Sequence, residues 1–290
     1  MCAHIFFWFD KKVFDGLSRH AMSEVASERA GCGLHNYTTA ADLKMLTVKS
    51  RPVNEELIDP LREKLLLLQG EEGYDGDEIT SFCQDEHNLR RFLVARDNNP
   101  DKSYEMAAAA IKWRSEIKPT TLTVADFDTA NSQGVWRFAG YAKNGWPIML
   151  VRTSLFDPCY TTEEYVRYIA YMMEKNIERM DPSNANGQRH FIIFDMHDMN
   201  YNTDYAKLRE LIRIANDYHP ERLGIALTVN ASTLFWGLWK IMSPWMDTYT
   251  SEKVKVFTSD YKDFLDEHVG LENVYTDLGG KKEEDWPTPE

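Results

Sequence analysis

The densest apolar pattern in the chain lies in its last third, where a buried strand is followed by an unusually hydrophobic helix. Residues 225–229 form a short apolar run of the kind found in strands that are covered on both faces. Residues 234–242 predict a helix of about three turns, which begins near Ser232 or Thr233 and ends before Pro244. Its apolar residues cover about two-thirds of the circumference, whereas a surface helix needs a stripe of only roughly 100°.

This helix is too short to cross a bilayer, which requires about 20 apolar residues, so its surplus apolar surface must contact something else. A lipid ligand and a membrane surface both satisfy that requirement. Burial on all sides within a large core is the third explanation. The periodicity alone does not choose among the three.

Earlier in the chain, apolar residues recur at helical spacing. They predict a helix over residues 54–68, interrupted at Pro60, and two further helices over 85–97 and 101–117. The last two are separated by a short turn, which is typical of an αα-hairpin. This part of the chain is therefore predicted to be a small all-helical module.

After residue 130 the pattern alternates between strands and helices. The predicted strands cover residues 148–151, 191–195, 225–229 and 253–257, and the predicted helices cover 162–179, 203–215, 234–242 and 261–268. This order predicts an α/β fold with a mixed, largely parallel sheet flanked by helices. The chain thus divides into an N-terminal extension without a clear pattern (1–52), a helical module (53–130), an α/β domain (131–280) and an acidic tail (281–290).

The first residues contain an apolar run, residues 5–9, but they lack a basic region before it and are interrupted by Asp10 and two lysines. A secretory signal is therefore not predicted. The run can form an amphipathic segment that docks on the protein or lies on a membrane interface, or it can be a disordered end.

Composition narrows the functional classes. A hydrophobic content of 43% is ample for a buried core, and the formal net charge of −13 argues against nucleic-acid binding and against attachment to anionic membranes by bulk charge. The four cysteines (Cys2, Cys32, Cys83 and Cys159) are scattered, so the sequence predicts neither a disulfide framework nor a zinc site. Reduced thiols in a cytoplasmic protein are the expectation.

Catalytic motifs are absent from the sequence: it has no GxSxG, no GxxxxGK[ST] and no GxGxxG after a strand. Asp195, His197 and Asp198 lie at the end of a predicted strand, where α/β proteins often place chemistry. Strand alternation turns these side chains to different sides, and no third partner is visible. We therefore expect a protein that is not an enzyme and holds no metal.

Several motifs together resemble the CRAL-TRIO, or Sec14-like, lipid-transfer family. They are PERLG at residues 220–224, Asn-Ala at 230–231, the apolar helix at 234–242 and the Pro-aromatic-x-Asp turn at 244–247. The arginine-rich run at 89–96, the Trp113-Arg114 pair and the Gly-Gly at 279–280 follow the same family pattern in the same order.

This resemblance implies a lipid pocket that is closed by residues 234–242 as a gate helix, with the helical module as the family's N-terminal module. It implies no cofactor. The residues expected to form the pocket and gate are Ile193, Leu227, Val229, Leu234, Phe235, Leu238, Trp239 and Met242.

The resemblance also implies a headgroup site. Glu221 and Lys253 are 32 positions apart, as in relatives that bind phosphatidylinositol, and the family pattern adds Arg96 and Thr250. Such a headgroup needs a cation for its phosphate and polar partners for its ring. An ordinary salt bridge between Glu221 and Lys253 is the simpler alternative. Asp97 departs from the family pattern, which often has a basic residue at this position. Its negative charge is expected to repel a phosphate nearby.

The expected function is binding of a single lipid, of phosphatidylinositol type, and its exchange between membranes through transient peripheral contact. Two alternatives remain open: an adaptor that acts through protein contacts, and a carrier of a retinoid or tocopherol. Met149 stands where phosphatidylcholine binders can have a tyrosine, so a choline site that depends on that tyrosine is not predicted.

Overall fold

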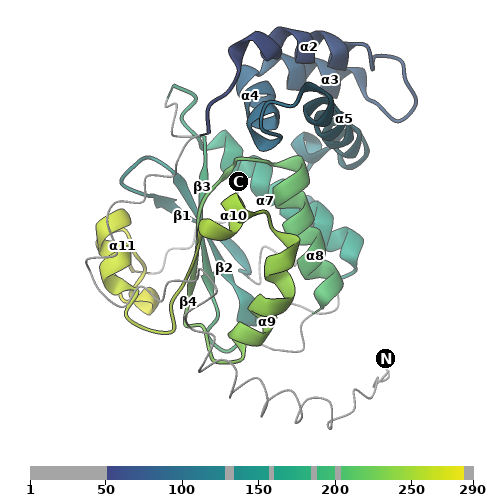
Figure 1. The fold of residues 1–290 in the computed structure, drawn as a ribbon. Helices are drawn as coiled ribbons and strands as arrows, with labels where there is room; N and C mark the ends of the chain where they lie inside the picture. Colours follow the sequence, from purple (N-terminus) through teal and green to yellow (C-terminus); the bar gives the residue numbers. More distant parts are fainter. Residues whose placement is uncertain (1–50, 128–133, 157–159, 184–187, 200–203, 284–290) are drawn as a thin grey trace, which may run out of the picture. The chain divides into compact units, whose positions relative to one another are not determined.

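The computed structural model describes residues 51–127, 134–156, 160–183, 188–199 and 204–283 (Figure 1). All of them belong to one unit, Leu43–Glu290. Residues 1–50, including the apolar run at 5–9, lie outside the described residues, as does most of the acidic tail.

The helical module is built from four α-helices. They are α2 (Ile58–Leu66), α3 (Gly76–Gln84), α4 (Glu86–Ala95) and α5 (Pro100–Ile117), and a 3₁₀ turn, η3 (Glu55–Leu57), precedes α2. Asn54 accepts a hydrogen bond from the Glu56 amide and thereby caps the 3₁₀ turn. Pro60 lies in the first turn of α2, where its missing N–H group costs nothing, so the expected interruption is instead the start of the helix.

Helix α3 is the element of the module that the apolar pattern does not predict. Asp75 initiates it, because its carboxylate accepts hydrogen bonds from the Asp77 and Glu78 amides. The four helices bury one shared core, whose most completely buried members are Leu65, Ile79, Leu89, Phe92, Leu93, Ala107, Ala110 and Ile111.

The α/β part contains a five-stranded sheet in the order β1-β2-β3-β4-β5. The strands are β1 (Trp136–Tyr141), β2 (Pro147–Arg152), β3 (His190–Asp195), β4 (Leu223–Val229) and β5 (Val254–Val256). β1 pairs antiparallel with β2, and the remaining neighbours are parallel. The prediction of a mixed, largely parallel sheet is confirmed. β1 was not predicted from its short sequence, WRFAGY.

Helices cover both faces of this sheet. Figure 1 shows α7 (Thr162–Glu178), α8 (Tyr205–Arg213) and α9 (Phe235–Met242) on one face and α11 (Lys262–His268) on the other. A five-residue helix, α10 (Thr248–Glu252), precedes β5, and a π-helical turn, η7 (Ile214–Tyr218), extends α8. Short 3₁₀ turns cover Pro119–Thr121, Val124–Phe127, Thr153–Leu155, Ser243–Trp245 and Thr276–Leu278.

The starts of α7 and α8 follow from their capping residues. Thr161 and Glu164 form a reciprocal capping box at the start of α7. Asp204 caps α8 by accepting hydrogen bonds from the Ala206 and Lys207 amides. Tyr205, the first residue of α8 after this cap, is 48% exposed.

Candidate functional site

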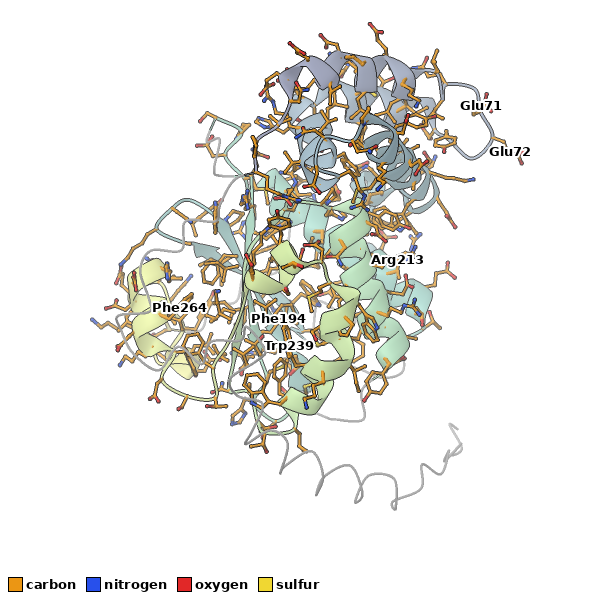
Figure 2. All side chains as sticks on the ribbon, viewed as in Figure 1. Glu71, Glu72, Phe194, Arg213, Trp239 and Phe264 are labelled. Carbon is orange, nitrogen blue, oxygen red and sulfur yellow. The ribbon has the colours of Figure 1, made fainter. Side chains whose placement is uncertain are left out.

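An apolar cavity of about 230 Å³ lies between the sheet and helices α7, α8 and α9. Figure 2 labels two side chains that line it, Phe194 of β3 and Trp239 of α9. The other main lining residues are Val151, Ile192, Ala226 and Thr228 from the sheet, Tyr165, Ile169 and Met173 from α7, Leu208, Leu211 and Ile212 from α8, and Phe235, Leu238 and Met242 from α9.

The gate residues predicted from the sequence mostly line this cavity. Phe235, Leu238, Trp239 and Met242 do so, and the first three of them are buried. Leu234 does not, and 52% of its surface is exposed. It immediately precedes α9 and is not part of the cavity lining, so its assignment to the pocket is corrected.

The strand residues predicted for the pocket lie on the opposite face of the sheet. Ile192 on β3, and Ala226 and Thr228 on β4, line the cavity. Successive side chains of a strand alternate between faces, so Ile193, Leu227 and Val229 are buried on the face that α11 covers in Figure 2, where Phe264 is labelled. A strand buried on both faces does not reveal from its sequence which set faces a ligand.

The outer side of α9 explains why its sequence is apolar around so much of its circumference. Phe235 and Trp239 face inward, while Leu234 and Ile241 are exposed, the latter by 43%. Complete burial of this helix, one of the three explanations offered by its sequence, is therefore excluded. Both the cavity and the exterior receive apolar side chains from α9.

Three charged residues stand immediately before three neighbouring parallel strands. Arg189 precedes β3, Glu221 lies two residues before β4, and Lys253 precedes β5. Because parallel strands start at the same edge of a sheet, these side chains meet there. The carboxylate oxygen Oε2 of Glu221 lies 3.7 Å from Nζ of Lys253 and 3.9 Å from Nη2 of Arg189. We call these three residues together with Arg51 the Glu221 cluster.

Arg51 makes the closest contact with Glu221. Its Nη2 donates to Oε1 of Glu221 at 2.6 Å, and its Nη1 donates to Oδ1 of Asp97 at 3.1 Å. The guanidinium also lies 4.1 Å from the ring centroid of Tyr249 on α10. Arg51 belongs to the extension that showed no pattern, so no sequence signal pointed to it. Its ion pair with Asp97 balances the charge that was expected to repel a phosphate.

Burial dominates the electrostatics of the Glu221 cluster. It lowers the pKa of Lys253 and of Arg189, and Glu221 opposes both shifts. Burial also acts to lower the pKa of Arg51, but the hydrogen bond to Glu221 raises it overall. Glu221 has a backbone φ of 58°, a left-handed conformation that non-glycine residues rarely adopt and that often marks functional sites.

The other two predicted headgroup residues are placed differently. Thr250 lines the cavity, and its carbonyl accepts a hydrogen bond from the Lys253 amide, so it connects the cavity to the Glu221 cluster. Its hydroxyl donates to Asp247 at 2.9 Å. Arg96 donates to its neighbouring carbonyl, and its charge opposes the burial that raises the pKa of Asp217. Its described contacts therefore do not place it in the cluster.

The strand-end group that suggested chemistry is a structural turn. Oδ1 of Asp195 accepts hydrogen bonds from the side chain of Asn230 at 2.8 Å and from the amide of His197 at 3.0 Å. Among the described residues, no group of three or more His, Cys, Asp or Glu side chains is arranged to hold a metal ion. Within the same residues, no helix combines the length and apolarity that crossing a membrane requires.

Comparison with known proteins identifies the family to which this chain is similar. The family model described as the CRAL/TRIO domain matches residues 131–280, just over half of the chain. A CRAL-TRIO domain-containing protein of Schizosaccharomyces pombe is 27% identical over 91% of this chain and 61% of its own length. The phosphatidylinositol/phosphatidylcholine transfer protein SFH11 of Arabidopsis thaliana is 28% identical over 83% of this chain and 66% of its own length. The chain thus spans less than two-thirds of the length of these relatives.

A shorter relative and a solved structure agree with this result. The Sec14 cytosolic factor of S. pombe is 26% identical over 68% of this chain and 74% of its own length. The crystal structure of Sfh5 superposes with a TM-score of 0.62 at 17% identity, covering 75% of this chain and 85% of that one. The structural likeness confirms the predicted fold class.

Proposed function

The chain belongs to the CRAL/TRIO domain family, and we propose that it binds one phospholipid molecule, of phosphatidylinositol type, in the cavity beneath α9 and transfers it between membranes. The names of two relatives, a phosphatidylinositol/phosphatidylcholine transfer protein and a Sec14 cytosolic factor, support this proposal. The predicted family resemblance is confirmed.

The observation that carries the proposal is an apolar cavity with a charged cluster at one edge. Leu223, at the start of β4, and Val254, at the start of β5, line the cavity, and Glu221 and Lys253 lie within two residues of them. An amphiphile fits this arrangement, because its chains gain from burial in the cavity while its headgroup contacts charged partners.

We propose that α9 moves outward when a whole lipid enters the cavity. Its volume of about 230 Å³ is smaller than the roughly 300–1,000 Å³ typical of pockets for drug-sized ligands. A two-chain phospholipid is larger than such ligands. Outward movement of α9, which forms one wall of the cavity, creates the missing space.

The headgroup roles follow from charge and hydrogen-bonding capacity. Lys253 supplies a cation for the phosphate, and Glu221 with Thr250 supplies partners for inositol hydroxyl groups. The salt bridge between Glu221 and Lys253 at 3.7 Å is present without a ligand, and in this proposal the headgroup is inserted at that contact.

The exposed side of α9 supports transient membrane contact. Leu234 and Ile241 present apolar surface at the helix that must move for lipid exchange. The chain's net charge of −13 does not favour anionic membranes, so the contact is local and apolar.

Lipid extraction followed by native mass spectrometry tests whether the purified protein carries a phospholipid. The double variant Phe235→Asp/Trp239→Asp then tests the cavity. We expect it to abolish lipid transfer between vesicles, because two carboxylates in an apolar site each bring a desolvation penalty of several kcal/mol.

Leu67→Asp is the matched control, because Leu67 is 79% exposed on the helical module, away from the cavity lining. It should transfer lipid as the wild type does. Circular dichroism of the double variant checks that the fold persists. Transfer at the wild-type rate by a folded double variant contradicts the role of α9.

A further inference from the structure

Arg189 is the member of the Glu221 cluster that has a buried donor atom without a hydrogen bond in the part of the chain that the structure describes. Its Nη1 atom is buried and has no hydrogen-bond partner among the described residues. Its Nη2 lies 3.9 Å from Glu221, which is an ion-pair distance but longer than a hydrogen bond. The side chain is only 15% exposed, so water replaces the missing partners poorly.

A buried guanidinium in this state is costly unless an acceptor is supplied. Removing a buried donor from water without giving it a partner is unfavourable, and more so for a charged group. Glu221 cannot supply the partner, because its Oε1 accepts from Arg51 at 2.6 Å and its Oε2 is shared between Lys253 and Arg189. Three cations therefore face one carboxylate in the buried part of the cluster.

The position of Arg189 indicates which group of a ligand can accept its hydrogen bond. Arg189 and Lys253 flank the same Glu221 oxygen, from the strands on either side of β4. A phosphate placed against that edge can accept from both cations, and the planar fork of an arginine suits phosphate oxygens.

We propose that Arg189 is a second phosphate-binding residue of the headgroup site, acting with Lys253, so that it selects lipids that carry a phosphate regardless of what is attached to it. This inference rests on the proposed function and extends it. Glu221 then discriminates among headgroups, and Arg51 holds Glu221 in place through their 2.6 Å hydrogen bond.

The test compares three lipids with identical acyl chains: phosphatidylinositol, phosphatidylcholine and diacylglycerol. Each is offered in vesicles of otherwise constant composition, and the fraction captured by the protein is measured. Arg189→Ala should weaken capture of both phospholipids by about tenfold or more, because each loses the same charge-assisted hydrogen bond. Capture of diacylglycerol should change by less than about twofold, because it has no phosphate.

Two further variants separate binding from folding. Arg189→Lys should recover part of the phospholipid capture, because it keeps the charge but loses the planar fork. Arg213→Ala is the matched control, since Arg213 is an arginine on α8 that pairs with Glu210 and is labelled in Figure 2. It should capture all three lipids as the wild type does. Equal loss for all three lipids in Arg189→Ala, together with a lower melting temperature, overturns the proposal in favour of a structural role.

A double variant distinguishes direct contact from positioning. If Arg189 only orients Glu221, then adding Arg189→Ala to Glu221→Gln should have no further effect on phospholipid capture. If Arg189 contacts the phosphate, the double variant should lose about the same factor again. Absence of that additional loss overturns the proposal.

The proposed function and this inference fail in different ways. If the wild-type protein captures neither phospholipid, both the proposed function and the role of Arg189 are contradicted. If the wild-type protein captures phospholipid and Arg189→Ala captures it equally well, only the role of Arg189 is contradicted. Titration with inorganic phosphate identifies the source of the anion: Arg189-dependent phosphate binding that persists in lipid-loaded protein overturns the headgroup assignment, and its absence supports it.

Discussion

Two buried charged groups in this protein are built in opposite ways. The first, which we call the Arg114 network, joins α5 to α3 and α7. Nε of Arg114 donates to Glu78 at 2.9 Å, and its Nη1 donates to Glu174 at 2.6 Å. His219 completes the network, with its Nε2 3.4 Å from Glu174. One guanidinium thus joins two carboxylates through short hydrogen bonds.

The Glu221 cluster reverses this ratio. Three cations surround one carboxylate, two of them at 3.7 and 3.9 Å, and one arginine nitrogen has no partner among the described residues. In the Arg114 network the arginine donors form hydrogen bonds within the protein, whereas the Glu221 cluster contains a donor without a partner among the described residues. From this difference we infer that the first is structural and that the second is organised around a ligand.

The largest expected effect concerns the Arg114 network. Arg114→Met leaves Glu78 and Glu174 buried without their shared cation, which should lower the free energy of unfolding by about 3–5 kcal/mol. Urea denaturation followed by circular dichroism measures this loss. Arg90→Met is the control, because Arg90 pairs with the exposed carboxylates of Glu55 and Glu86, and the loss of these pairs should cost about 1 kcal/mol or less. Equal losses in the two variants would show that the Arg114 network stabilises the fold no more than a surface ion pair does.

The next effect concerns the Glu221 cluster. Lys253→Ala removes a charge-assisted interaction of roughly 1.5–3 kcal/mol, so phosphatidylinositol transfer should fall about ten- to a hundredfold. Transfer of a lipid held only by its chains should survive, because burial of those chains does not involve the ammonium. Vesicle transfer assays with both lipids measure the contrast. Equal loss for both lipids would place Lys253 with the structural group.

The smallest effect tests the histidines near the Arg114 network through pH. Burial lowers the pKa of His219, and it lowers that of His190 well below the ordinary value near 6.5. Both are therefore neutral when folded and take up a proton on unfolding in acid. Stability from these two groups is then fully present above about pH 6.5, the ordinary pKa of an unfolded histidine, and is lost as the pH falls below it.

Chemical denaturation at pH 7.5 and 5.5 measures this loss. His190→Asn should reduce the difference between the two pH values, because it removes one of the two buried imidazoles. His197→Asn should leave the difference unchanged, because the side chain of His197 is 70% exposed. A pH dependence that is the same in all three proteins would show that other groups cause it.

Local sequence was sufficient to predict the helices and strands that have strong apolar periodicity or clear capping residues. Thr161 and Glu164 specify the start of α7 as a capping box, and the apolar runs of β3 and β4 are correctly predicted as strands. Helix α9 was also predicted, because its apolar residues lie between a serine and a proline. β1 and α3 were missed, because neither short segment repeats its apolar residues for long enough.

The sequence by itself determined the α/β class, the family and the presence of an apolar helix with more hydrophobic surface than one packed face needs. The tertiary structure decided which strand face meets the cavity, because Ile192 and Ile193 are both apolar and only the packing of α7 to α9 distinguishes them. It also decided the composition of the Glu221 cluster. Arg51, Arg189, Glu221 and Lys253 are distant in sequence, and parallel strand pairing brings the last three to one edge of the sheet. Such contacts depend on long-range pairing, which no local pattern records.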